Sequence, residues 1–175
     1  MEKLLIITPV KDSIQTTLDT IHAIMESRIT TPHSYTIYND NSTAENTAIL
    51  EKEAEKYGFR LVNICDLTDH PSPNYLLVLQ MAQREALEQN AGLCIVESDV
   101  TVKPDTLQRL FDGAKTRKDC GIAAAVTVDG NGDINYPYLY AKGRENQEYE
   151  TKKHRSFCCS LPPPTLLSQS AFHQL

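Results

Sequence analysis

Apolar residues along the first 120 positions follow two different periods. Short apolar runs, typical of buried strands, alternate with stretches in which apolar residues recur every three or four positions, as on one face of a helix. The predicted strands are residues 3–8, 35–39, 59–64 and 93–96. The predicted helices are residues 13–28, 43–56, 75–89 and 104–118. This alternation indicates βαβ units, and therefore an α/β fold with a mostly parallel sheet and helices on both faces.

Polar residues and glycines at the ends of these segments predict where the helices begin and end. Asp12 or Ser13 can cap the first helix. Ser42 and Glu45 have the spacing of a capping box, and Gly58 supplies a left-handed stop for the same helix. In the third helix, one apolar stripe is expected to face inward, and its members are Leu76, Leu79, Ala82 and Ala86. Pro104 suits the first turn of the fourth helix.

The alternation stops after Gly121. Residues 122–128 and 134–140 are predicted strands on either side of a glycine-rich turn, and a charged loop occupies residues 141–155. Residues 157–159 are a candidate strand, and residues 165–175 a candidate short helix.

Composition narrows the class of protein. A chain of 175 residues is long enough for one domain with a sizeable core. The net charge of −6 argues against a surface that binds nucleic acid. The five cysteines have no zinc-site or disulfide pattern. Neither a signal peptide nor a membrane-length apolar segment is recognisable, so we expect a cytoplasmic protein.

Two carboxylates follow the fourth predicted strand. Residues 93–96 are four apolar residues in a row, which predicts a strand buried on both faces. Glu97 and Asp99 come next, and in an extended chain they would face the same point beyond the strand. Such hard oxygen ligands suit Mg²⁺ or Mn²⁺. The alternative is that these acids only cap a helix or face water.

Other polar residues also follow predicted strands. The first strand ends at Thr8 and Pro9, and the second runs into Asp40. The carboxyl ends of parallel strands meet at one edge, where open α/β sheets bind their ligands. We therefore expect Thr8, Asp40, Glu97 and Asp99 at a common edge.

This ordered set of motifs resembles the family-2 glycosyltransferases of the GT-A (Rossmann-like) fold. The matching segments are residues 5–10 (LIITPV), residues 38–43 (YNDNST), Asn74 before the third helix, and residues 97–99 (ESD) with Pro104 after them. Val10 and Lys11 depart from the pattern, because the family has an aromatic residue and an asparagine there. The resemblance covers residues 3–110.

The resemblance implies roles for individual residues. Thr8 and Pro9 would contact the nucleoside, and Asp40 would accept the N–H of a uracil-like base. Asn74 would belong to the same nucleotide site. Glu97 would lie on the ribose or in the metal shell, and Asp99 would bind Mn²⁺ or Mg²⁺ on the donor diphosphate.

The resemblance also implies an activity. It is the inverting, metal-dependent transfer of a hexose from a UDP-sugar to a saccharide or lipid-linked acceptor, as in polysaccharide biosynthesis. Residues 1–175 would be one domain, with a nucleotide-binding part (1–120) and the start of an acceptor-side part (121–175). The family's catalytic base lies later than the residues given, which implies a chain truncated at its C-terminus. Peripheral membrane association through the missing part stays open.

The catalytic base and two alternative functions also stay open. Three acids in the charged loop are better explained as a solvated face than as the base, namely Glu145, Glu148 and Glu150. One alternative is a fragment that binds a nucleotide-sugar without catalysis. The other is a receiver-like signalling domain, which would need an acidic pair where Thr8 to Lys11 stand.

Overall fold

The computed structural model describes residues 1–132 and 157–159 of the chain. It divides into two compact units, Met1–Phe111 and Asp112–Leu175. The first unit contains every residue for which the sequence predicts a role at the site.

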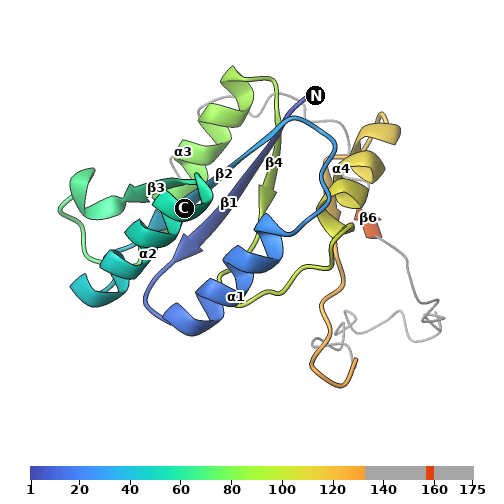
Figure 1. The fold of residues 1–175 in the computed structure, drawn as a ribbon. Coiled ribbons are helices and arrows are strands. Elements are labelled where there is room, and N and C mark those ends of the chain that lie inside the picture. Colours follow the sequence, from blue (N-terminus) through green and yellow to red (C-terminus); the bar gives the residue numbers. More distant parts are fainter. Residues whose placement is uncertain (133–156, 160–175) are drawn as a thin grey trace, which may run out of the picture. The chain divides into compact units, whose positions relative to one another are not determined.

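The first unit is built on a four-stranded parallel sheet (Figure 1). Its strands are β1 (Leu4–Val10), β2 (His33–Asn39), β3 (Arg60–Asn63) and β4 (Gly92–Ile95), and their order is β3-β2-β1-β4. All three pairings are parallel. The predicted α/β fold with a parallel sheet is therefore confirmed.

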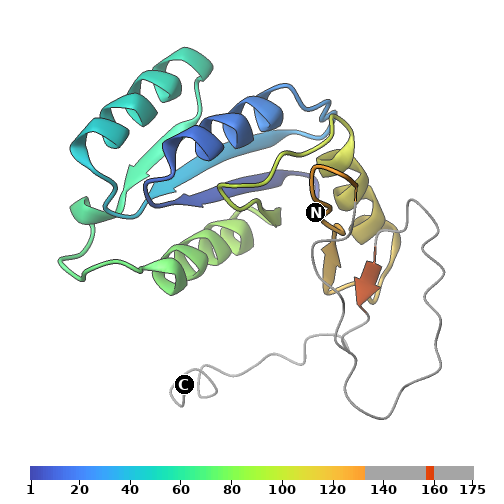
Figure 2. The same cartoon turned by 90° about the horizontal axis from the view of Figure 1, so that it is seen from below.

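Helices cover both faces of this sheet, as predicted. Helices α1 (Ile14–Met25) and α2 (Ala44–Tyr57) lie on one face, and α3 (Tyr75–Glu88) lies on the other (Figure 2). A 3₁₀ turn, Ile64–Asp66, follows β3. Helix α4 (Thr106–Thr116) begins two residues after Pro104, which the sequence placed in its first turn. Within the described residues, no helix is long and apolar enough to cross a membrane.

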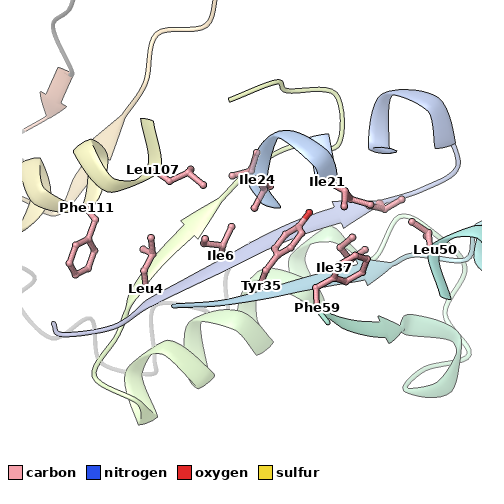
Figure 3. Close-up of a cluster of buried hydrophobic side chains, with 12 residues drawn as sticks. Leu4, Ile6, Ile21, Ile24, Tyr35, Ile37, Leu50, Phe59, Leu107 and Phe111 are labelled. Atoms are coloured by element: carbon pink, nitrogen blue, oxygen red, sulfur yellow. The ribbon is translucent and has the colours of Figure 1, made fainter. Parts of the chain in front are cut away.

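Each face of the sheet has its own apolar core. The larger core lies on the side of α1 and α2, where Ile6 and Ile37 of the sheet meet Ile21 and Leu50 of the helices (Figure 3). The smaller core lies under α3, where Ile7 and Tyr38 meet Val78 and Ala82; this second set explains which stripe of α3 faces inward.

Two predictions about buried apolar residues are wrong. Leu76 of α3 is 63% exposed, because the buried stripe of this helix runs through Val78, Ala82 and Ala86. Ile95 at the end of β4 is 43% exposed, although the sequence predicted a strand buried on both faces. The reason is that β4 pairs only with β1 and forms an edge of the described sheet.

Pro9 does not end the first strand as predicted, because β1 continues through Pro9 to Val10. The carbonyl of Ile7 accepts from Val96 N–H (2.9 Å), so the backbone polar groups of Ile7 point toward β4. Backbone groups two residues apart in a strand point the same way, so the nitrogen of Pro9 also lies on the β4 side. The β4 pairing stops at Ile7. Pro9 therefore lies where no ladder hydrogen bond is lost by its missing N–H.

The predicted helix caps are confirmed only in part. Gly58 has φ +75° and its N–H bonds the carbonyl of Ala54, so the left-handed stop is confirmed. The N-cap of α2 is Thr43 rather than Ser42, and its hydroxyl accepts from Asn46 N–H (3.3 Å). Ser13 occupies the N-cap position of α1 without a side-chain cap bond.

In the second unit, β5 (Ile122–Ala124) pairs antiparallel with β6 (Phe157–Cys159). This confirms the strand predicted at residues 157–159. A turn closes at Gly132, whose N–H bonds the carbonyl of Asp129 (3.0 Å) and whose φ is +89°. The predicted strand 134–140, the loop 141–155 and the helix 165–175 lie outside the described residues.

Gly92 and Gly113 should respond to alanine in opposite ways. A Cβ on Gly92 would lie 3.2 Å and 3.3 Å from ring atoms of the buried Phe111, so Gly92→Ala should lower the free energy of unfolding by about 1–2 kcal/mol. Gly113, in α4, has nothing within 4 Å of such a Cβ, so Gly113→Ala should raise it by about 0.5–1 kcal/mol. Urea unfolding of both variants checks this, and a Gly92→Ala protein as stable as wild type would contradict the packing.

Candidate functional site at the carboxyl edge of the sheet

The carboxyl ends of β1, β2 and β4 gather the predicted site residues at one edge of the sheet. Thr8 and Pro9 are among the last three residues of β1, and Asp40 directly follows β2. Glu97 and Asp99 follow β4, and both are exposed. The expectation that the strand order brings these residues to a common edge agrees with the parallel topology.

Asp40 fastens the loop that leads into α3. Its Oδ2 accepts from the Ser72 hydroxyl and from the backbone N–H of Asn74, each at 2.7 Å. Its Oδ1 accepts from the Asn74 side-chain amide at 2.8 Å. Asp40 is 7% exposed and Asn74 8%. The two predicted nucleotide-site residues therefore contact each other. Within the described residues Oδ1 accepts this one hydrogen bond, and a carboxylate oxygen can accept two.

These hydrogen bonds determine the charge state of Asp40. Burial by itself would raise the pKa of Asp40, but the hydrogen bonds from Asn74 and Ser72, with the nearby Lys11, outweigh it and hold the pKa below its usual value. The carboxylate is therefore ionised at neutral pH, although it is nearly buried.

Glu97 is held by a tyrosine that the sequence analysis did not single out. The hydroxyl of Tyr75, the first residue of α3, donates to Oε1 of Glu97 at 2.7 Å. Burial, together with the hydrogen bond to Glu97 and its charge, raises the pKa of Tyr75 to about 12. Tyr75 is therefore protonated at neutral pH and can act as the donor.

Asp99 lies in a turn, not in extended chain. The N–H of Val100 bonds the carbonyl of Glu97 (3.3 Å), and Ser98 and Asp99 are the residues between them. The expected extended chain from Glu97 to Asp99 is therefore wrong, and a common point faced by the two carboxylates remains a prediction. What the turn preserves is their common place beyond the end of β4, with both carboxylates exposed.

The donor set at this edge fits a divalent cation only in part. Within residues 1–132, no group of three histidines, cysteines or acids is close enough to hold a metal ion. Mg²⁺ and Mn²⁺ commonly use one or two carboxylates and take their other ligands from water and substrate phosphates. Two exposed carboxylates after β4 fit that type of site, and they do not fit a metal held by protein alone.

The two residues at the end of β1 differ in accessibility. Thr8 is fully buried on the α1 side, and its Oγ1 accepts from the Tyr35 hydroxyl at 3.0 Å. Its side chain thus offers a nucleoside no accessible atom in this structure. Pro9 is half-buried. Contact between the nucleoside and these residues remains a prediction, with Pro9 the more accessible of the two.

The loops after β1 and β2 are joined by contacts that periodicity could not reveal. Oδ1 of Asp12 accepts from Thr43 N–H (2.8 Å) and from the Asn46 amide (3.1 Å), and these bonds lower the pKa of Asp12. The backbone N–H of Asp12 donates to Ser42 Oγ (2.8 Å). Asp12 therefore braces the start of α2 instead of capping α1.

Backbone conformations at this edge are unusual for residues with side chains. Asp12, Ser13 and Asn41 have φ of 52°, 46° and 58°. Such left-handed residues cluster at functional sites when the surrounding structure holds them in place. The only sequence signal for them is residue type, because Asp and Asn tolerate this region better than most residues.

A cavity of about 430 Å³ lies elsewhere, around the amino ends of β1, β2 and β3. Its lining includes Lys3, Phe59, Arg60 and Glu85. Arg60 and Glu85 already form an ion pair with each other. The chemistry that the sequence predicts is at the opposite edge of the sheet, so the cavity is not part of the candidate site.

No protein-family model and no curated protein sequence matches the chain. Among solved structures, the mannosyltransferase PcManGT from Pyrobaculum calidifontis, in complex with GDP-Man and Mn²⁺, matches 71% of the chain with a TM-score of 0.53 and 17% identity. The chain shares its fold with this mannosyltransferase. At this identity, the likeness establishes the fold alone. It supports the predicted Rossmann-like glycosyltransferase fold, and membership of family 2 remains a prediction.

Two structures of the S. aureus protein TarS are also similar. TarS 1-349 in complex with UDP-GlcNAc matches 65% of the chain, with 20% identity and a TM-score of 0.45. The longer TarS structure matches 65% with 18% identity and a TM-score of 0.46. The chain covers 35% of PcManGT, 32% of TarS 1-349 and 20% of the longer TarS, and so spans about a third or less of each.

Proposed function

We propose that the chain binds a nucleotide-sugar donor at the carboxyl edge of the sheet and serves metal-dependent, inverting glycosyl transfer. The observation that carries this proposal is the presence of two features at one edge. One is the Asp40 carboxylate after β2, held by the amide of Asn74, and the other is the exposed pair Glu97 and Asp99 after β4. The fold shared with a mannosyltransferase supports the same class of reaction. The acceptor is proposed to be a saccharide or lipid-linked hydroxyl.

Different residues at this edge would bind different parts of the donor. Asp40 would accept the imino N–H of uracil on Oδ1, beside the amide of Asn74, which favours UDP over nucleotides whose base has no ring N–H. Pro9 lies beside the nucleoside. Adenine and cytosine have no ring N–H at their pairing edge and would leave this further hydrogen bond of Oδ1 unmade.

The carboxylates after β4 serve the diphosphate side. Asp99 would hold Mn²⁺ or Mg²⁺, with Glu97 on the ribose or in the metal shell. The bound cation supplies Lewis-acid neutralisation of the diphosphate as it leaves the sugar. The general base for the acceptor hydroxyl is not assigned, since Glu145, Glu148 and Glu150 lie outside the described residues.

The rival function is nucleotide-sugar binding without catalysis. It uses the same edge and the same residues, and it differs only in whether the sugar is transferred. Incubation with labelled UDP-sugar and a mixture of acceptors separates the two, because only the enzyme releases UDP together with a labelled product.

A thermal-shift panel tests the proposed site. UDP, GDP, ADP and CDP are each compared with and without Mn²⁺. UDP at about 100 times its Kd with Mn²⁺ should add about 2.7 kcal/mol to the free energy of unfolding, and so raise Tm by about 5–10 °C. ADP and CDP, whose bases have no ring N–H, should raise it less. GDP shows whether the site also accepts a purine with a ring N–H. Chelation of Mn²⁺ should remove most of the effect. A Tm that no nucleotide changes, with or without Mn²⁺, would contradict the proposal.

A further inference from the structure

The hydrogen bond between Tyr75 and Glu97 joins the start of α3 to the end of β4. The Tyr75 hydroxyl and Glu97 Oε1 are 2.7 Å apart. Both residues are exposed, Tyr75 at 40%. An exposed glutamate ordinarily samples several rotamers, and a ligand that uses it must bear the entropic cost of fixing one. A donor mounted on a helix removes part of that cost before the ligand arrives.

Tyr75 is itself anchored from the other side of the site. Its neighbour Asn74 gives both its backbone N–H and its side-chain amide to Asp40, at 2.7 Å and 2.8 Å. The Asn74 carbonyl in turn accepts from Val78 N–H at 3.1 Å, within the first turn of α3. The start of α3, and with it Tyr75, is therefore held by Asp40 at the end of β2.

These bonds form a continuous connection across the edge. It runs from Asp40 after β2, through Asn74 and Tyr75 at the start of α3, to Glu97 after β4. The strand β1 lies between β2 and β4 in the sheet, so the first turn of α3 bridges the two carboxylates over the end of β1.

We infer that Tyr75 is a positioning residue for donor binding: its hydroxyl fixes the Glu97 carboxylate beyond the end of β4, and the first turn of α3 connects that carboxylate to Asp40. The inference rests on the proposed function and adds a residue to it. Tyr75 acts through Glu97, so its contribution should vanish when Glu97 is removed.

A double-mutant cycle tests this. Calorimetry measures the affinity for UDP with Mn²⁺ in wild type, Tyr75→Phe, Glu97→Ala and the double variant. Tyr75→Phe should weaken binding by about 3–10-fold, the range for one lost hydrogen bond. The double variant should bind like Glu97→Ala alone, because the phenylalanine then has no further effect. Urea unfolding should show Tyr75→Phe as stable as wild type within about 0.5 kcal/mol.

Tyr57→Phe is the matched control. Tyr57 ends α2, on the opposite face of the sheet from α3, and its ring contacts His22 and Lys56. This variant should bind UDP with Mn²⁺ as wild type does. Unchanged affinity in Tyr75→Phe, or an equal loss in the wild-type and Glu97→Ala backgrounds, would overturn the positioning role while the proposed function stands. Absence of binding by the wild-type chain would overturn both.

Discussion

The variant Asp99→Ala is expected to lose Mn²⁺-dependent UDP binding and to keep its fold. Asp99 is exposed in the turn after β4, so it contributes nothing to either core. In the proposed site Asp99 is a direct ligand of the cation, and water and the diphosphate supply the other ligands. Loss of a direct metal ligand should exceed the roughly 10–100-fold that loss of an outer-shell partner costs. Calorimetry with UDP in the presence of Mn²⁺ measures the change.

Asp19→Ala provides the control for charge. Asp19 is an exposed carboxylate on α1, and its removal changes the net charge of the protein by the same amount. This variant should bind UDP with Mn²⁺ as wild type does. If Asp99→Ala binds UDP with Mn²⁺ as well as wild type does, Asp99 is not a metal ligand. If Asp19→Ala loses as much affinity as Asp99→Ala, the loss reflects the change in net charge and not a metal site.

Asp40→Asn should lower the free energy of unfolding at pH 7 by about 2–4 kcal/mol. The amide keeps the shape of the side chain, but its NH₂ group would face donors from Ser72 and Asn74 that now bond to carboxylate oxygens. At 7% exposure, water cannot easily replace the lost partners. Urea unfolding measures the difference. Asp69→Ala, an exposed carboxylate in the loop before α3, should change stability by less than about 0.5 kcal/mol.

The pKa of Asp40 predicts how the difference in free energy of unfolding between wild type and Asp40→Asn depends on pH. The folded-state pKa of Asp40 is lowered, so the unfolded state takes up the proton first as the pH falls. The contribution of Asp40 is complete above the unfolded-state pKa of about 4 and is lost as the pH falls through the folded-state value. The stability gap between wild type and Asp40→Asn should therefore be constant from pH 5 to 7 and narrow below about pH 4. A stability difference that widens in acid would contradict the hydrogen bonds from Ser72 and Asn74 to an ionised Asp40.

Local signals in the sequence predicted the elements of the fold well. Gly58 stops α2 because a left-handed residue is a local requirement that its own residue type satisfies. Ile95 shows where such signals fail. A run of apolar residues predicts a strand, but whether both faces are covered depends on which strands lie beside it, and β4 is an edge of the described sheet.

For the site, the sequence predicted which residues follow the strands but not what they contact. Asp40 accepts hydrogen bonds from Ser72 and Asn74, which are more than 30 positions later in the chain. No local pattern in the sequence reveals these bonds. The Tyr75–Glu97 bond spans 22 residues in the same way. The position of Thr8 near the end of β1 predicts a place at the site, yet the alternation of side chains along β1 turns it into the core, toward Tyr35.

A crystal structure of the chain with UDP and Mn²⁺ tests the central claim most directly, because the anomalous signal of manganese locates the metal independently of the protein. We expect one manganese position about 2.1 Å from a carboxylate oxygen of Asp99, between that side chain and the diphosphate, with the uracil beside Asp40. Nucleotide bound in the cavity at the amino ends of the strands, or manganese held without Asp99, would contradict it.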